Sequence, residues 1–530
     1  MPVNPTYPGV YIQEIPSGVR TIAGVATSVT AFVGRTKRGV VGEPTSCFNF
    51  GEFSRRFGGL WSDGPATYAV DDFFANGGGQ ALIVRLFKPN DANDDGIADL
   101  TIGNLKLRAA NPGAWGNQLS GRVSHPEDPA SAAEMAAQHG LVANDLFDLV
   151  IDDADSGASE TFRNLTVKEA GGALRVDRVL AESSSLVRLA LKNDGTPDLP
   201  GSRPPATDPN AAAPTASGGN DGLALDPLDF IGDEAKKTGI YALLKADLFN
   251  LLCIPPDTRG GTLDKSVREK AAELCADRRA LLIVDPPAHW DANPSEAAAK
   301  VKAEQLDPAK AVLSLTYAAS AALYFPRLRK RDPLRGGQMD VFVPCGAVAG
   351  VMARTDVNRG VWKAPAGMNA TISGAEELTV KLTDDENGLV NPIGVNCLRS
   401  FPNLGRVVWG SRTLRGSDAL ADVYKYVPVR RLALYIEESL YRGTQWVVFE
   451  PNDEPLWALI RLSVGAFMQR LFRQGAFQGA SQREAYFVKC DSETTTQDDI
   501  NRGIVNIVVG FAPLQPAEFV IISIQQIRSA

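Results

Sequence analysis

The chain has 530 residues and a formal net charge of −8, with 44% hydrophobic and 22% charged residues. This length and composition fit a globular protein of about two to four domains, and the acidic balance argues against general nucleic-acid binding, which needs a basic surface. Six cysteines are scattered without a CxxC pair, which favours reduced thiols over a disulfide framework or a zinc site.

The chain begins with TYPGVYIQEIPSG, a short strand-like stretch bounded by prolines, and ends with the apolar, β-branched run FVIISIQQIRSA. Chain ends usually fray and tolerate polar residues, so two adhesive ends are unusual. The first residues show no basic stretch followed by an apolar one, and no apolar run reaches about 18 residues, so neither a signal peptide nor a membrane insertion is expected.

From residue 21 onward, strand and helix patterns alternate. FNFGEFSRRFGGL has aromatic residues at helical spacing and a glycine stop, TYAVDDFFANGGG repeats this pattern, and QALIVRLF is a buried strand. The alternation resumes near residue 230 with LLCIPP, VREKAAELCADRRA and LLIVDPP, followed by KAVLSLTYAASAALYF, which predicts a helix, and DVFVPCGAVAGVMAR, which predicts a strand and a helix. The simplest account is an α/β domain split into residues 21–90 and 231–365.

Residues 91–230 predict a β-rich inserted domain, because LFDLVIDD and LVRLALK have strand-like patterns. Their exit, TPDLPGSRPPATDPNAAAPTASGGNDG, is almost entirely small, polar or proline residues, which predicts a flexible segment. An insertion with a flexible exit is expected at the periphery.

Residues 366–515 predict a C-terminal α+β domain. VPVRRLALYIEESLYRG is an amphipathic helix whose apolar face excludes Arg430, Arg431, Glu437 and Glu438. A second helix begins after Asn452 or Asp453 as its cap. Two strand patterns, NIVVGFAP and FVIISIQQ, close the chain in a hairpin-like arrangement around PLQP.

The second helix carries arginines among large apolar residues, at positions 461, 470 and 473. One interpretation is that Arg461, Arg470 and Arg473 form the solvated side of a core helix. The other is a docking face for an acidic partner.

No catalytic motif is present, so the chain is predicted not to be an enzyme and no cofactor is expected. The three histidines are far apart, GxSxG is absent, and GGTLDKS lacks the glycine that precedes the lysine of a phosphate-binding loop. No metal site is predicted apart from one weak calcium candidate, in which Asp91, Asn93, Asp95 and Asp99 occupy ligand positions of an EF-hand-like loop. Because Ile102 replaces the bidentate glutamate, the alternative is an Asx-rich turn.

Several long blocks resemble one family. They are YPGVYIQEIPSGVRTIAGVATSVTAFVGRTKRG with FGEFSRRFGG, then GVWKAPAG, GVNCLRSFPNLGRVVWGSRTL, VRRLALYIEESLYRGTQWVVFEPNDEPLW and DDINRGIVNIVVGFAPLQPAEFVIISIQQI. Their order and spacing resemble the contractile-tail sheath proteins of phages, R-type pyocins and extracellular contractile injection systems. The resemblance covers nearly the whole chain except the insertion.

The resemblance implies a structural subunit that polymerises as stacked hexameric rings around an inner tube and contracts to drive the tube through a target envelope, without nucleotide hydrolysis. It implies as partners further copies of the chain, an inner tube protein, and baseplate and terminator or cap proteins. It also implies assembly in the bacterial cytoplasm into a virion tail or a released particle. The sequence does not indicate whether the particle is a phage tail or an injection system, or which state, extended or contracted, a structure would represent.

In the family, the chain ends add strands to sheets of neighbouring subunits, which implies roles for residues 1–20 as an N-terminal linker arm and 516–530 as a C-terminal exchange strand. The exchange residues are Val10, Tyr11, Ile12, Gln13, Glu14, Ile15, Phe519, Val520, Ile521, Ile522, Ser523, Ile524, Gln525, Gln526 and Ile527. The expected receiving sheet contains Asn506, Ile507, Val508, Val509, Gly510 and Phe511. Alternatively, the C-terminal strand pairs within its own chain.

The family also has a tube-facing helix, for which Arg461, Arg470 and Arg473 are the candidates. The alternative function, from a different class, is a calcium-dependent surface-binding protein that acts through the inserted domain.

Overall fold

The computed structural model describes residues 20–91 and 94–522. They fall into two compact units. The larger unit contains Ser28–Arg354 and Pro365–Asp422, and the C-terminal unit contains Thr355–Ala364, residues from Val423 onward, and the described residues up to Thr27. Within the described ranges, no helix is long and apolar enough to cross a membrane. All six cysteines are buried as free thiols.

An eight-stranded sheet organises the larger unit, with the order β17-β16-β12-β11-β10-β1-β3-β2. Its strands are β1 (Thr30–Gly34), β2 (Thr45–Cys47), β3 (Ala81–Arg85), β10 (Leu251–Cys253), β11 (Leu281–Val284), β12 (Ala321–Phe325), β16 (Val395–Phe401) and β17 (Gly405–Val408). The central pairs are parallel, and β2 and β17 are antiparallel edge strands. The central strands are buried on both faces, as their continuous apolar sequences predict.

Helices complete this unit: α1 (Phe50–Phe57), α2 (Pro65–Ala75), α5 (Pro227–Ile231), α6 (Lys265–Asp277), α7 (Ala297–Leu306), α9 (Asp384–Val390) and most of α8 (Cys345–Arg359). The predicted helix at FNFGEFSRRF is confirmed as α1. Asn49 caps it by accepting the Glu52 N–H at 2.8 Å, and Gly58 ends it with a left-handed φ of 88°.

The helix predicted for residues 310–325 is wrong. The segment AALYF forms β12 instead, which lies between β11 and β16 in the sheet. Short apolar runs that are buried on all sides do not distinguish a helix from a central strand by periodicity, and here strand pairing decides.

The large sheet also continues past residue 366, where the sequence placed the start of the C-terminal domain. β16 pairs with β12, and β17 pairs with β16, so residues 366–422 lie with the larger unit. A smaller sheet in this unit contains β13 (Leu328–Asp332), β14 (Gln338–Phe342) and the short β15 (Glu377–Leu378).

Between β3 and β10 the chain builds two three-stranded sheets with their own apolar core. One contains β4 (Asp99–Ile102), β5 (Leu105–Ala109) and β9 (Val187–Leu189), the other β6 (Leu119–Ser124), β7 (Leu146–Asp153) and β8 (Ala158–Thr166), and the helices are α3 (Pro129–Gln138) and α4 (Val176–Ser183).

The exit of the insertion differs from the predicted flexible segment. Its backbone is hydrogen-bonded along β6 and β4: Gly121 N–H donates to the Pro214 carbonyl, Ala216 to Leu119, and Ser217 to Asp99. Backbone groups pair with a strand edge whatever their side chains are, so composition alone did not reveal this attachment.

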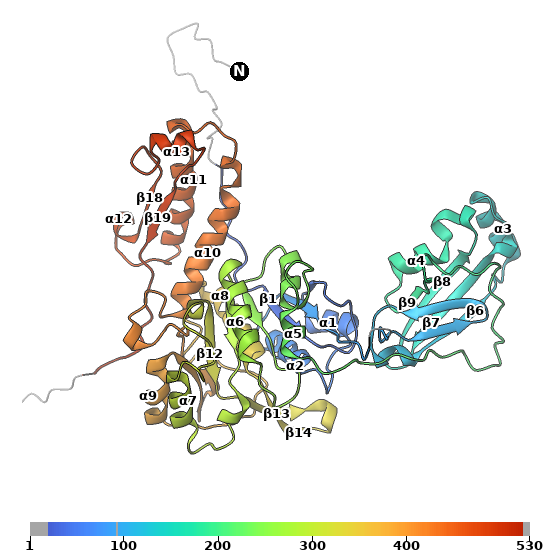
Figure 1. Cartoon of the computed structure of the whole chain (residues 1–530), viewed down its shortest axis with the longest axis horizontal. Helices are drawn as coiled ribbons and strands as arrows, with labels where there is room; N and C mark the ends of the chain where they lie inside the picture. Colours follow the sequence, from blue (N-terminus) through green and yellow to red (C-terminus); the bar gives the residue numbers. More distant parts are fainter. Residues whose placement is uncertain (1–19, 92–93, 523–530) are drawn as a thin grey trace, which may run out of the picture. The chain divides into compact units, whose positions relative to one another are not determined.

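The C-terminal unit contains α10 (Val427–Gly443), α11 (Glu454–Arg473), α12 (Gln482–Ala485), α13 (Gln497–Asn501), β18 (Tyr486–Lys489) and β19 (Val508–Phe511). The two long helices and the small sheet share one apolar core, and Figure 1 shows β18 and β19 beside α11. Asp453 is the cap of α11, and its carboxylate accepts the Leu456 N–H at 3.3 Å.

The predicted polar face of α10 is partly wrong. Arg431 and Glu438 are buried rather than solvated. Arg431 forms a two-pronged ion pair with Asp356, at 2.6 and 2.9 Å, and Glu438 accepts from Arg442 at 2.7 Å. In both cases a charged partner compensates the burial, and for Arg431 that partner lies 75 residues away in the sequence, which helical periodicity cannot reveal.

Candidate functional site

The small sheet of the C-terminal unit contains residues that the sequence assigned to a receiving sheet. β19 pairs antiparallel with β18, and the register places Phe511 opposite Tyr486 and Val508 opposite Lys489. Asn506 and Ile507 precede the strand, and Asn506 N–H donates to Thr495. The partner strand β18 was not anticipated.

Within the described part of the chain, β19 pairs with β18 alone, so its other edge has no strand beside it. Ala512 N–H donates to the Ala485 carbonyl at 2.8 Å, which makes the neighbouring pair Tyr486–Phe511 a non-hydrogen-bonded one. The alternation then directs the backbone groups of Val508 and Gly510 toward β18, and those of Val509 and Phe511 outward. Among the described residues, no hydrogen bond is recorded for the outward N–H groups of Val509 and Phe511.

The two faces of this sheet differ. Val509 and Phe511 pack against the apolar core, where the Phe511 ring lies 5.7 Å from that of Phe477. On the other face, the half-exposed Phe487 ring covers Gly510, where an added Cβ would lie 2.2 Å from the ring. Glycine at position 510 is therefore required by this close approach. A two-stranded sheet with an open edge accepts a further strand readily.

The described part of the C-terminal tail carries apolar side chains in solvent. Residues 519–522 belong to no strand, and their side chains are 71–89% exposed. Just before them, Glu518 accepts a hydrogen bond from the Tyr426 hydroxyl at 2.9 Å. Burial, and then this bond, raise the pKa of Tyr426. These four residues form no hairpin with β19, and residues 523–527 lie outside the described part of the chain.

The three arginines of α11 have different surroundings. Arg461 pairs with Glu454 at 2.5 Å and donates to the Cys490 carbonyl. Arg470 donates to the Ile22 carbonyl at 2.7 Å and lies over the Phe467 ring. Arg473 is exposed in the last turn. The first two therefore have structural contacts of their own, while Arg473 faces solvent.

The residues predicted to form the N-terminal exchange strand, Val10 to Ile15, lie outside the described residues. The weak calcium candidate lies partly outside them too, since Asn93 is not described. Of its other members, Asp95 accepts two hydrogen bonds from Arg108 at 2.7 and 2.8 Å, and Asp99 accepts one at 3.0 Å. An arginine thus neutralises two of the carboxylates expected to bind calcium. Residues 20–91 and 94–522 contain no group of three or more His, Cys, Asp or Glu that could hold a metal ion.

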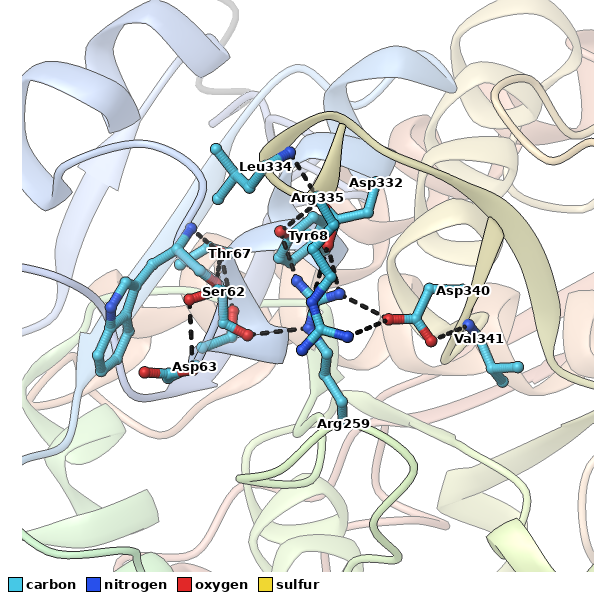
Figure 2. Close-up of polar contacts among 12 residues, drawn as sticks. Ser62, Asp63, Thr67, Tyr68, Arg259, Asp332, Leu334, Arg335, Asp340 and Val341 are labelled. Atoms are coloured by element: carbon cyan, nitrogen blue, oxygen red, sulfur yellow. Dashed lines mark hydrogen bonds and ion pairs between the residues drawn. The ribbon is translucent and has the colours of Figure 1, made fainter. Parts of the chain in front are cut away.

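A polar cluster that the sequence did not reveal lies beside the large sheet. Arg259, in the segment between β10 and α6, donates to Asp332, to Asp340 at 2.8 Å, and to the Tyr68 hydroxyl at 2.6 Å (Figure 2). Asp332 is fully buried and also accepts from Tyr68 at 2.8 Å. One arginine thereby ties α2, β13 and β14 together.

The ionisation of this cluster follows from burial and charge. Burial and the hydrogen bond to Asp332 raise the pKa of Tyr68 to about 12. Burial opposes the ionisation of Asp332, but the hydrogen bonds from Tyr68 and Arg259 outweigh it and lower the pKa. The cluster is therefore a paired, structural network, without a free acid, base or nucleophile.

Two family models match most of the chain after the insertion. Residues 237–414 match the phage tail sheath protein central domain, and residues 421–527 match the phage tail sheath C-terminal domain. The tail sheath protein of Vibrio phage KVP40 is 28% identical over 127 residues, which are 24% of this chain and 18% of that protein. The curated tail sheath proteins it resembles are matched over only 18–28% of their own length.

Solved structures match over nearly the full length. The sheath of an extracellular contractile injection system, PVC, in its contracted state is 20% identical with a TM-score of 0.55, over 99% of this chain and 98% of that one. A sheath tail protein from Listeria innocua is 15% identical with a TM-score of 0.58, over 93% and 96% of the two chains. At these identities the likeness establishes the mixed α/β fold.

Proposed function

Because the chain belongs to the contractile-tail sheath family, we propose that it is the sheath subunit of a phage tail or contractile injection particle. It polymerises as stacked six-membered rings around an inner tube and contracts without nucleotide hydrolysis. The family is a structural one, so the prediction from the residues that the chain is not an enzyme is confirmed by its membership.

The observation that carries the assembly part of this proposal is a pair of complementary features in one unit. β19 presents outward backbone groups at Val509 and Phe511, and the tail at residues 519–522 presents an apolar, unpaired segment. If the tail of one copy adds as a strand to β19 of another, the outward backbone groups become hydrogen-bonded and the tail becomes covered. Backbone hydrogen bonds then supply affinity, and alternate side chains set the register. The N-terminal residues Val10 to Ile15 are the second donor in this proposal.

Such junctions join neighbouring copies heterologously, and a heterologous contact that does not close on itself generates a helical filament. Strand junctions at the chain ends also let rings shift while their neighbours stay attached. The energy for contraction then comes from the difference in free energy between two arrangements of the lattice rather than from a nucleotide.

For the inner tube, α11 is the proposed contact, with Arg473 as the leading candidate. Arg461 and Arg470 already form hydrogen bonds within their own unit, so their guanidinium groups are less available to a partner. Baseplate and cap proteins are the further proposed partners, at the two ends of the sheath. No observation favours the calcium-dependent alternative, because Asp95 and Asp99 form ion pairs with Arg108.

Deletion of residues 519–530 tests the proposal. The described part of this segment, residues 519–522, is exposed, so the shortened chain is expected to keep the melting temperature of the full chain and to lose polymerisation, measured by sedimentation. Polymerisation that survives this deletion contradicts the role of the C-terminal strand.

A further inference from the structure

The loop between α10 and α11 exposes large apolar side chains in an unusual backbone conformation. Val448 is 62% exposed, Phe449 102%, and Tyr441, in the last turns of α10, 55%. Phe449 has a left-handed φ of 70°. This region is unfavourable for a bulky residue, and a fully exposed phenyl ring gains no packing that offsets the cost. Tyr441, Val448 and Phe449 are called the Phe449 patch below.

This loop is held in place at both ends. Val447 N–H donates to the Thr444 carbonyl at 2.9 Å, and Glu450 N–H donates to the Val447 carbonyl at 3.1 Å. On the other side, Asn452 donates to the Ile504 carbonyl at 3.0 Å and accepts from the Trp457 indole at 2.9 Å. The exposure of the Phe449 patch therefore belongs to an ordered turn and does not result from a frayed end.

The N-terminal segment leaves the C-terminal unit beside this loop. The guanidinium of Arg20, the first described residue, lies 4.7 Å from the centre of the Trp446 ring and 4.0 Å from the Glu450 carboxylate. Ile22 is buried in the core of the same unit. The Trp446 indole N–H is buried and has no hydrogen-bond acceptor among the described residues. A donor of this kind needs an acceptor, and the residues that precede Arg20 are joined to the chain beside Trp446.

The sequence before Arg20 fits this place. Residues 7–15 contain five apolar or aromatic side chains, at Tyr7, Val10, Tyr11, Ile12 and Ile15. They are followed by Pro-Ser-Gly at residues 16–18, a composition typical of a turn. The five steps along the chain from Ile15 to Arg20 can span about 17 Å, enough for the chain to turn back over the loop.

We infer that the Phe449 patch is a docking surface for residues 7–15 of the same chain before assembly. In this arrangement the Trp446 indole donates to a backbone carbonyl of that segment. Docking covers an apolar segment that otherwise exposes unpaired strand edges and aggregates. The inference does not require that the chain polymerise, and it concerns the subunit before any strand is exchanged.

Photocrosslinking tests this inference in the full chain. Benzoylphenylalanine replaces Phe449, which is fully exposed, or, as a control, Val357, which is 82% exposed in α8 of the same unit. Equal amounts of unlabelled and ¹⁵N-labelled protein are mixed below the assembly concentration and irradiated. We expect crosslinks from position 449 to residues 7–15 within chains of one isotope only, and none to that segment from position 357.

Each other outcome overturns the inference. Mixed-isotope crosslinks mean that the patch is covered by a second copy, and crosslinks to another segment, or none, mean that residues 7–15 do not dock there. As an independent measurement, hydrogen exchange at the amides of residues 448–450 is expected to be at least about tenfold slower in the unsubstituted chain than in a Val10→Asp/Ile12→Asp variant. Equal exchange rates in the two proteins likewise contradict docking.

Discussion

Proline at position 509 tests the open edge of β19, because it removes a backbone N–H that points away from β18. A strand added at this edge meets the N–H and C=O groups of Val509 and Phe511, which are four backbone groups. At about 0.5–1.5 kcal/mol for each net hydrogen bond, they contribute about 2–6 kcal/mol to a junction between two subunits. Val509→Pro removes one of the four, so each junction is expected to weaken by about 1 kcal/mol, or about fivefold.

Two control variants separate this effect from loss of fold. Val509→Ala shortens the same side chain but keeps the N–H, so the difference between alanine and proline isolates the hydrogen bond. Val508→Pro removes an N–H that faces β18 and is expected to lower the melting temperature. Sedimentation should show that Val509→Pro assembles at about fivefold higher concentration than Val509→Ala, with a similar melting temperature. Equal assembly of these two variants refutes the assignment of β19 as a junction.

Three further predictions concern the buried charges and the exposed arginine. Arg259→Met leaves the fully buried Asp332 without its main cation and is expected to cost about 3–5 kcal/mol in chemical denaturation; a cost below 1 kcal/mol contradicts the network. Burial raises the pKa of Asp285 to about 6, so its ionisation removes stability as the pH rises from about 4 to about 6. The melting temperature of Asp285→Asn should therefore rise relative to the unsubstituted chain across that window, and a constant difference would show that no such proton is held. Arg473→Glu should leave unfolding unchanged and weaken co-sedimentation with the inner tube by about tenfold, whereas unchanged co-sedimentation returns Arg473 to a merely solvated role.

Local patterns carried much of the fold. The aromatic spacing and glycine stop of α1, the continuous apolar runs of β3 and β11, and the cap and proline of α11 all predict the observed elements. These signals are local, so they can be recognised without knowledge of the tertiary structure. β12 was misassigned because strand pairing, and not its own periodicity, determines its conformation.

In the candidate site, too, some features follow from the local sequence and others depend on residues far along the chain. The strand containing Val509 was predicted from its β-branched sequence, but its pairing with β18 and its open edge depend on register, which only the structure gives. The role of Arg259 depends on carboxylates far along the chain. Position 449 is neither glycine nor asparagine, the residues that usually adopt a left-handed φ, so nothing in the sequence indicated this conformation.

The central claim is that this chain polymerises into a sheath, and electron microscopy of the purified full-length protein tests it most directly. Negative-stain images, taken alone and with the inner tube protein, are predicted to show stacked rings or tubes with sixfold symmetry. Particles that stay single subunits in every condition, with and without the tube, would contradict the account.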